Sequence, residues 1–484
     1  MVNLIRNYGW MLLGAILCVP ALQAQQADSD KNDPRDQPIK PYPAIMSSGG
    51  AIESPVDLPQ APVAEVEVAA DERPLSGVQE LTLGSNVGAR SFLIPSISAM
   101  SQLDMNSSAS SFYGPASSSY LVGTVDLNHV SERSAFLLHC TGGGMFSNYL
   151  NSAILDLDFS YSFKWRRWSL LLGDQASFLS ESPFGFGGVG GLAFLNGISQ
   201  FDPSGVLASI LNASLTPNQT IPTIIVPRLS NTVVSQLEYD LSPRSSWTAS
   251  GSLDTLNFFG AGFIDSTEGL FQTGYNYRLN PQSSVALIYR FDGFRFNQFP
   301  QTIDNHVVQV GYARYVTGRM AFQIAAGPSV VVLRGPVTGS TNNYSWALDT
   351  ALTYRLDRTM LLLSYDHFVT GGSGVLIGAQ TSQAQATVER DLTPRWQGSL
   401  ALGYATNRNL VDTIVDPGNG PYNSWYAAVR FTRQLRSNTA IFLAYGARLQ
   451  ALNAAICRIP NCGTSSVSHE ISAGFNFGLR PILF

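Results

Sequence analysis

The chain has 484 residues, and length alone would suggest about three domains. Only 13% of the residues are charged, against about 25% in ordinary soluble proteins, yet the mean hydropathy is just +0.06. No run of 18 or more apolar residues follows residue 25, which excludes an ordinary helical membrane protein. Low charge without strong hydropathy is typical of a transmembrane β-barrel, where apolar and polar residues alternate along each strand.

The charge balance also restricts the partners. The formal net charge is −5, so the chain lacks the basic footprint that nucleic-acid binding requires. Nucleic acid is therefore excluded as a partner.

Residues 1–24 are predicted to be a secretory signal peptide. Arg6 supplies the positive charge, Tyr8 to Leu22 form the apolar region, and Ala24 closes a cleavage site. Cys18 could only be a lipoprotein site if a small residue preceded it, and Leu17 is bulky.

Residues 25–90 differ in composition from everything that follows. They hold eight prolines between Pro34 and Pro74 and scattered Asp and Glu, without apolar periodicity. This composition predicts a disordered, acidic periplasmic tether with a relaxed reach of about 45 Å. A periplasmic protein or the cell wall is its candidate partner.

From about residue 91 to 484 the pattern is period two. In the segment 344–356, Tyr, Trp, Leu and Thr occupy one face, and Ser, Ala, Asp, Thr and Arg occupy the other. Residues 153–163 and 467–480 repeat this alternation. Strands of this length suit tilted membrane crossings.

Tight polar turns recur between these strands, near Ser131, Arg166, Pro243, Pro281, Gly318, Asp357, Pro394 and Ser437. Aromatic residues flank the turns, as expected for a girdle at one membrane interface. Eight turns join sixteen strands, and one strand before the first pair and one after the last bring the number to about 18. The sequence therefore predicts an all-β transmembrane antiparallel up-and-down β-barrel of about 18 strands. Sixteen is the alternative count, because residues 92–102 and 376–391 alternate poorly.

The region 91–484 resembles Gram-negative outer-membrane β-barrels of the porin type. The local feature that carries the resemblance is the last strand, Phe475-Asn476-Phe477-Gly478-Leu479, with a chain end at Phe484. In that family such an end is read by the barrel-assembly machinery, which is therefore an expected partner. Arg480-Pro481 interrupts the alternation, so Phe484 lies out of phase with Phe475.

The longest loop spans residues 181–230 and is the third long loop. In porins the third loop folds into the barrel and narrows it, so the resemblance implies a constriction here. Few charges and many apolar residues favour a loop that packs inward over one that covers the mouth or binds a partner. The candidate constriction residues are Phe184, Phe186, Phe194, Leu195, Leu207 and Ile210.

The polar faces of the strands give a candidate pore lining. Near mid-height acids predominate, and carboxylates in a pore favour cations. These mid-height residues are Asp126, Asp156, Asp158, Asp254, Arg290, Asp349, Asp366 and Arg430. Nearer the turns, the periplasmic rim carries Asp240, Arg278, Arg355 and Arg480. Ion pairing that simply fills the interior is the alternative role for such charges.

Other kinds of site have weaker support. Five scattered histidines and no nucleophile motif predict that the chain is not an enzyme. We expect no cofactor and no metal, because the Cys and His residues are too dispersed. Cys457 and Cys462 are close enough in sequence to form a disulfide in an oxidising compartment.

The sequence therefore predicts a porin-like channel in the cell outer membrane. It would pass small hydrophilic solutes by passive diffusion, with a mild preference for cations and a constriction at residues 181–230. Outer-membrane lipid and small solutes are its expected partners. A gated transporter for hydrophobic compounds and a structural outer-membrane anchor are the two alternatives.

Overall fold

The computed structural model describes most of residues 91–484. Its longer gaps are 107–115, 180–227, 411–420 and 452–464, with shorter ones at 132, 148–150, 260–262, 281, 318, 336–338, 357, 373–375, 437 and 480–481. The signal peptide and tether predicted over residues 1–90 lie outside the described residues.

The described residues form β-strands. The first half of the barrel comprises β1 (Phe92–Asn106), β2 (Ala116–Val130), β3 (Ser134–Ser147), β4 (Ser152–Trp165), β5 (Trp168–Leu179), β6 (Arg228–Ser242), β7 (Ser245–Phe258), β8 (Ser266–Asn280) and β9 (Ser283–Phe296). The second half comprises β10 (Phe299–Thr317), β11 (Met320–Gly335), β12 (Gly339–Leu356), β13 (Thr359–Thr370), β14 (Ala379–Thr393), β15 (Trp396–Asn409), β16 (Tyr422–Arg436), β17 (Thr439–Ala451), β18 (Ser465–Gly478) and the two-residue β19 (Ile482–Leu483).

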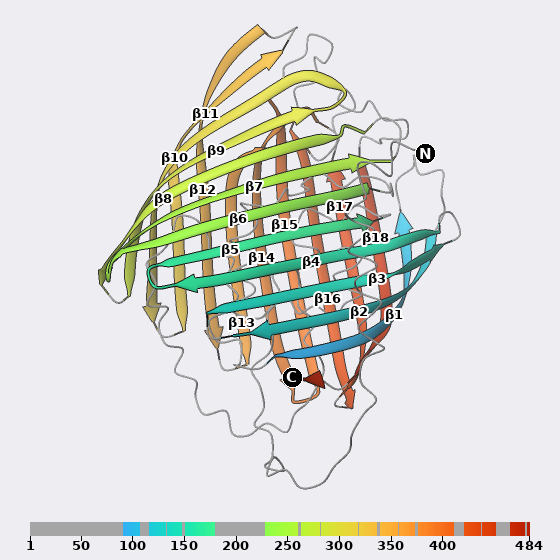
Figure 1. Ribbon diagram of the computed structural model, residues 1–484. Coiled ribbons are helices and arrows are strands. Elements are labelled where there is room, and N and C mark those ends of the chain that lie inside the picture. The colour runs from blue at the N-terminus through green and yellow to red at the C-terminus, as the bar shows by residue number, and fades with distance from the viewer. Residues whose placement is uncertain are drawn as a thin grey trace, which may run out of the picture. The chain divides into compact units, whose positions relative to one another are not determined.

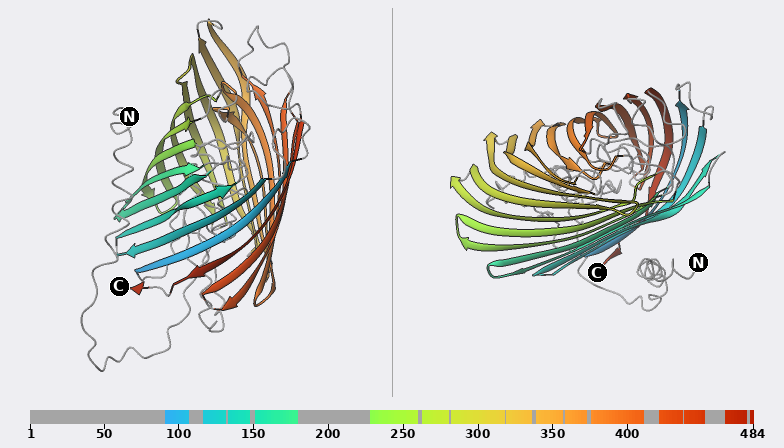
Figure 2. Two further views of the ribbon diagram at one scale, coloured as in Figure 1. Left: turned by 90° about the vertical axis from the view of Figure 1, so that its right-hand side faces the viewer. Right: turned by 90° about the horizontal axis from the view of Figure 1, so that it is seen from above.

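Each strand pairs antiparallel with the next, and β1 pairs with both β2 and β18. The sheet therefore closes on itself (Figure 1), and Figure 2 shows the strands curving round to meet. Over the described ranges the barrel has 18 long strands, which confirms the predicted fold class and the higher strand count. The two poorly alternating segments form β1 and β14.

All eight predicted tight turns join consecutive strands at one end of the barrel. Short turns mark the periplasmic end of such barrels and longer loops the extracellular end. The last turn residue is an exposed arginine at six of these turns, and its carbonyl accepts a hydrogen bond from the next hairpin. The bonds run from Lys164 to Arg133, Asp240 to Arg167, Arg278 to Arg244, Arg355 to Arg319, Asp391 to Arg358 and Gln434 to Arg395, at 2.7–3.0 Å. These contacts join adjacent hairpins beyond the regular ladder.

Alternation separates an apolar outer face from a mixed inner face. In β4, Tyr161 is 37% exposed on the outer face while its neighbour Ser160 is buried on the inner face. The outer aromatic girdle at the periplasmic end includes the packed pair Trp168 and Tyr239, whose ring centroids lie 4.3 Å apart. On β12, Tyr354 and Tyr344 are separated by ten residues, which at about 3.3 Å each and a tilt of about 40° spans the ~25 Å apolar band of a membrane barrel.

Among the described residues, no helix is long and apolar enough to cross a membrane.

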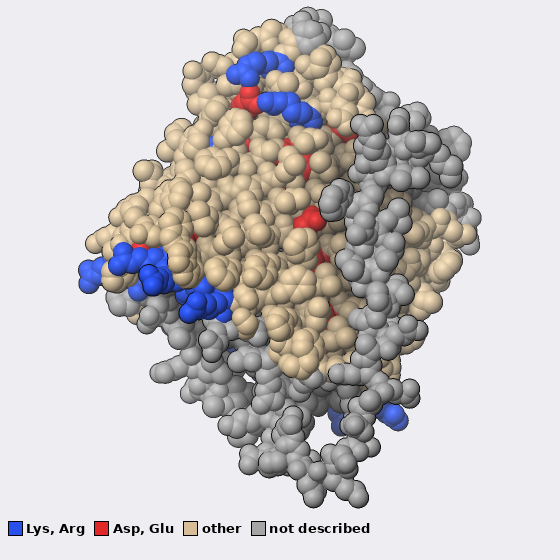
Figure 3. All heavy atoms as spheres, viewed as in Figure 1, with Lys and Arg blue, Asp and Glu red and all other residues tan. Residues whose placement is uncertain are grey.

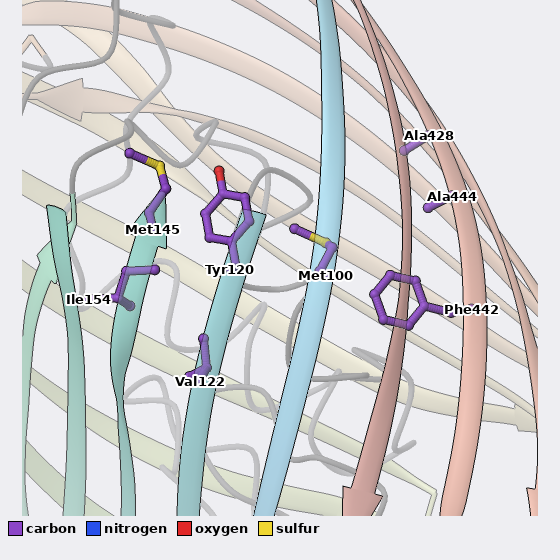
Figure 4. Packing of buried hydrophobic residues seen from close by; sticks show 8 residues of the cluster. All are labelled: Met100, Tyr120, Val122, Met145, Ile154, Ala428, Phe442 and Ala444. Atoms are coloured by element: carbon purple, nitrogen blue, oxygen red, sulfur yellow. The ribbon is translucent and has the colours of Figure 1, made fainter. Parts of the chain in front are cut away.

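An apolar cluster occupies the inner face where the barrel closes. Met100, Tyr120 and Met145 from β1–β3 pack with Phe442 from β17, as Figure 4 shows. Phe442 reaches past β18 because Gly474 has no side chain in its way: a Cβ there would lie 2.7 Å from the Phe442 ring. Val122, Ile154, Ala428 and Ala444 complete the cluster.

A second apolar cluster lies at the extracellular end of the inner face. Phe294, Ile303 and Val331, from the upper parts of β9, β10 and β11, are 0% exposed. They pack with Ile264 from the β7–β8 connection and with other apolar side chains from β13 and the loops. The β9–β11 side of the mouth is therefore lined by apolar groups.

The C-terminal strand corrects the expected phase of Phe484. Ser96 pairs with Gly478, but Leu93 pairs with Ile482, so the register shifts by one residue between β18 and β19. One extra residue reverses the inside–outside alternation. Phe484 is consequently 65% exposed and faces outward, as Phe475 does.

Candidate functional site: the inner wall of the barrel

The predicted mid-height charges lie on the inner face of the barrel. The described side chains are those of Asp126, Asp158, Asp254, Arg290, Asp349, Asp366 and Arg430. Asp156 occupies an inner register position opposite Thr141, but its side chain lies outside the described residues. Strand alternation thus puts these residues on the inner face, where several are buried, Asp254 and Arg290 at 2% and 4% exposure.

Two of the carboxylates are direct neighbours. Asp349 on β12 and Asp366 on β13 are opposite residues in the ladder. Like charges at such positions repel, so their shared location requires compensating groups. The amide Nε2 of Gln309 donates to Asp349 Oδ2 at 2.7 Å, and Arg290 interacts electrostatically with both carboxylates.

The contact between Gln309 and Asp349 crosses an entire strand. Gln309 is on β10 and Asp349 on β12, so the two side chains meet over β11. There the inward position paired with Asp349 is held by Ala325, which is too small to separate them. A small residue on the middle strand therefore links polar groups that are two strands apart.

Arg290 is part of a buried polar network on β9–β11. Its Nε lies 3.1 Å from Asp292 Oδ2, and both side chains are nearly inaccessible. Asn305 donates to the same carboxylate oxygen at 2.9 Å, and Ser329 donates to the Asn305 carbonyl oxygen at 2.7 Å. These bonds hold the guanidinium against the acidic wall.

Sequence reasoning missed two acids of this wall, Glu268 and Asp292. Glu268 on β8 is the ladder partner of Asp254 on β7, and both Glu268 and Asp292 interact electrostatically with Arg290. Spacing could have revealed Asp292, since it lies two residues from Arg290 and so shares its face. The position of Glu268 opposite Asp254 depends on the strand register.

A second acidic group surrounds His139, which is 0% exposed. Its Nδ1 lies 2.6 Å from Asp126 Oδ1, and its Nε2 lies 3.1 Å from the Thr141 hydroxyl. Asp158 is the ladder partner of His139 on the opposite side. The predicted residues Asp126 and Asp158 therefore flank one histidine.

Arg430 lies apart from the acidic wall. Its guanidinium carbon is 4.2 Å from the centroid of the Phe442 ring, a cation–π contact. Phe442 belongs to the apolar cluster of Figure 4. The inner surface therefore carries an acidic wall on β7–β13 and an apolar cluster at the point of closure, against which Arg430 packs.

The predicted rim residues lie at the periplasmic ends of their strands. Asp240 and Arg355 are exposed and Arg278 is half-buried, and the backbone amides of all three donate to turn arginines. Arg480 lies outside the described residues.

Other predicted sites cannot be placed in the same way. Phe184, Phe186, Phe194, Leu195, Leu207 and Ile210 lie outside the described residues, as do Cys457 and Cys462. The predicted loop 181–230 extends too far at its C-terminal end, because β6 already begins at Arg228. No group of three or more potential metal-ligating side chains occurs within the described part of the chain.

Comparisons with known proteins give structural neighbours only. No family model matches the chain, and no curated protein matches it. Two similar solved structures from Pseudomonas aeruginosa are OccK2 (OpdF), at 10% identity and a TM-score of 0.43, and OpdQ, at 11% and 0.41. The matches cover 80% and 81% of this chain and 98% and 99% of those chains.

The fold assignment follows from the barrel itself. A closed antiparallel sheet leaves no unpaired edge in lipid, its outer face is mainly apolar and girdled by aromatic residues, and its inner face carries most of the buried charged side chains. The described residues form a closed, membrane-spanning antiparallel β-barrel of the outer-membrane type.

Proposed function

We propose that the barrel is a passive channel for small hydrophilic solutes and that it prefers cations mildly. The observation that carries this proposal is the acidic wall on β7–β13, where four carboxylates interact with Arg290 and a fifth lies opposite Glu268. The carboxylates are those of Asp254, Glu268, Asp292, Asp349 and Asp366. A pore wall with excess carboxylates lowers the energy of a cation relative to an anion.

The loop predicted at residues 181–230 is the proposed constriction. Eighteen strands enclose an interior wider than side chains alone fill, so a channel of this size needs an additional element to narrow it. The apolar composition of the loop supports an inward position.

Single-channel recording in a planar bilayer under a salt gradient tests the cation preference. We expect stable open steps and a reversal potential shifted towards cations. In the variant Asp349→Asn/Asp366→Asn, the cation-to-anion permeability ratio should fall towards one. An unchanged ratio in folded protein would contradict the assignment of these carboxylates to the conduction path.

Asp174 provides a matched control. It lies on the outer face of β5, opposite Val233 of β6 and away from the inner wall. Asp174→Asn removes the same charge from the same barrel, so its permeability ratio should equal that of the wild type. Replacing residues 184–226 with a short Gly-Ser linker should raise the conductance if this loop narrows the pore, and leave it unchanged if it does not.

The extracellular apolar cluster favours a second candidate, a gated transporter for hydrophobic compounds. Phe294, Ile303 and Val331 would then close or line an apolar entrance. This candidate predicts no steady conductance in the wild type and open steps in Phe294→Ala/Ile303→Ala. Steady wild-type conductance would favour the passive channel.

A further inference from the structure

The outer face of the barrel carries a charged group at one extracellular edge. It consists of Arg295 on β9, Asp304 on β10 and Arg334 on β11. Ladder pairing places them outward, because Asp304 pairs with Gly293 and Arg334 pairs with Thr302, while their neighbours Phe294, Ile303 and Leu333 are buried inside. In Figure 3, basic side chains with an acidic one between them occupy the upper end of this face, above a mainly uncharged surface.

The two arginines converge on one carboxylate. Arg295 Nη1 lies 2.9 Å from Asp304 Oδ1, and Arg334 Nη1 donates to Asp304 Oδ2. Arg295 Nη1 also donates to the backbone carbonyl of Phe294 at 2.8 Å and lies 3.4 Å from that of Ile303. The carboxylate is 9% exposed, so the acid is covered while it holds both guanidiniums at the surface.

Both guanidiniums keep unused donors. Their side chains are 50% and 56% exposed, and within the described residues all their hydrogen bonds and ion pairs use Nη1. An arginine has five N–H donors, so Nε and Nη2 of each remain open to an acceptor. Two such forks side by side suit the oxygens of a phosphate, which guanidinium binds in a bidentate manner.

The position of this charged group along the barrel axis indicates which kind of phosphate it can bind. Tyr344 on β12 pairs with Val330 on β11, and Val330 pairs with His306 on β10. This row belongs to the aromatic girdle at the extracellular interface: Tyr344 is 80% exposed, and Tyr289 lies 2.9 Å from the His306 ring. Arg334 is four residues beyond Val330, which at about 3.3 Å per residue and a tilt of about 40° is about 10 Å above the girdle.

Groups about 10 Å beyond the apolar band lie among lipid headgroups. We propose that Arg295 and Arg334, held together by Asp304, bind a phosphorylated lipid headgroup of the outer leaflet. The lipid would fix the β9–β11 edge of the barrel in its membrane. This site is on the outer face and does not depend on the channel proposal.

Native mass spectrometry of the purified, folded full-length protein tests the site with bisphosphorylated lipid A as the probe. We expect retention of lipid A by the wild type and about tenfold weaker binding for each of Arg295→Gln and Arg334→Gln, because one charge-assisted bidentate contact is worth about that factor. Wild-type affinity in the double variant would overturn the proposal.

Arg408→Gln is the matched control. Arg408 is an exposed, outward-facing arginine at the extracellular end of β15, and it forms no ion pair within the described residues. Its variant should bind lipid A as the wild type does, whereas an equal loss there would mean non-specific charge attraction and would overturn the site.

Two further probes distinguish the source of the phosphate. Lipid A from which both phosphates have been removed should bind no more tightly to the wild type than to the double variant. Inorganic phosphate should fail to compete at concentrations equal to those of the lipid. Competition by inorganic phosphate at equal concentration would assign the site to a free anion and overturn the lipid assignment.

Discussion

The ring of Phe484 stacks on the ring of His129, with centroids 6.1 Å apart and planes within 9° of parallel. Phe484 follows β19 and His129 is on β2, so the contact spans the first strand of the barrel. The amide of Phe484 donates to the carbonyl of Ser91 at 3.3 Å, and the Ser91 hydroxyl lies 3.0 Å from His129 Nδ1. The last residue of the chain therefore helps fasten the closure of the barrel.

We predict that Phe484→Ala lowers the free energy of unfolding by about 1–2 kcal/mol, through lost aromatic contact and buried area. Urea titration of protein refolded in lipid vesicles measures the change. Phe484→Trp keeps the stacking surface and should stay near the wild-type value; equal losses in both variants would show that the stacking is not the cause. If the barrel-assembly machinery reads this end, as the resemblance implies, the Ala variant should also accumulate less in the outer membrane.

Arg166 in the β4–β5 turn has a φ of 49°, a left-handed conformation that side chains with a Cβ adopt at a cost. Arg166→Asn should raise the free energy of unfolding by about 0.5–1 kcal/mol, because Asn tolerates this region better. The neighbouring substitution Arg167→Asn removes the same charge without relieving a left-handed residue. A gain of stability in that variant as well would point to charge and not to backbone strain.

His139 provides the main polar contact of Asp126 on the inner wall. We expect His139→Ala to cost about 1–3 kcal/mol of unfolding free energy, because it leaves the Asp126 carboxylate without its hydrogen-bond partner. The same chemical unfolding assay applies. His306→Ala, at a more exposed position on the outer face, should change stability by no more than about 0.5 kcal/mol.

Gly474 lies beneath Phe442 in the apolar cluster at the closure. A Cβ there would lie 2.6 Å from the Ala99 carbonyl oxygen and 2.7 Å from the Phe442 ring, so Gly474→Ala should destabilise the barrel by about 1–3 kcal/mol. Gly446→Ala is the control on the neighbouring strand, where the nearest atom is Glu470 Cβ at an ordinary 3.8 Å. Thermal melting followed by loss of β-sheet circular dichroism compares the two, and an equal shift in both would contradict the packing argument.

Arg290 opposes the carboxylates that surround it, and this gives a prediction of opposite sign to the Asp349→Asn/Asp366→Asn experiment. Arg290→Gln should increase the cation-to-anion permeability ratio, since it removes positive charge from the acidic wall. Reversal potentials measured under the same salt gradient test it. Folding is checked by electrophoresis, in which the folded barrel migrates differently from the unfolded chain. A decrease of the ratio would contradict the proposed role of this wall.

The sequence by itself determined the class of fold, because the alternation and the turns that indicate this fold are local features of the chain. Period two in segments such as 344–356 reports which side of a strand faces lipid, and the eight turns near Ser131 to Ser437 report the number of strands. For the same reason the inner position of Asp254 or Asp349 could be predicted from alternation alone.

Only the tertiary structure decided which groups meet. Register set Asp349 opposite Asp366 and Glu268 opposite Asp254, and a small residue on β11 let Gln309 reach Asp349. The one-residue shift between β18 and β19 turned Phe484 outward, against the phase read from the sequence. These relationships join strands through pairing, and pairing offsets leave no mark on the periodicity of a single strand.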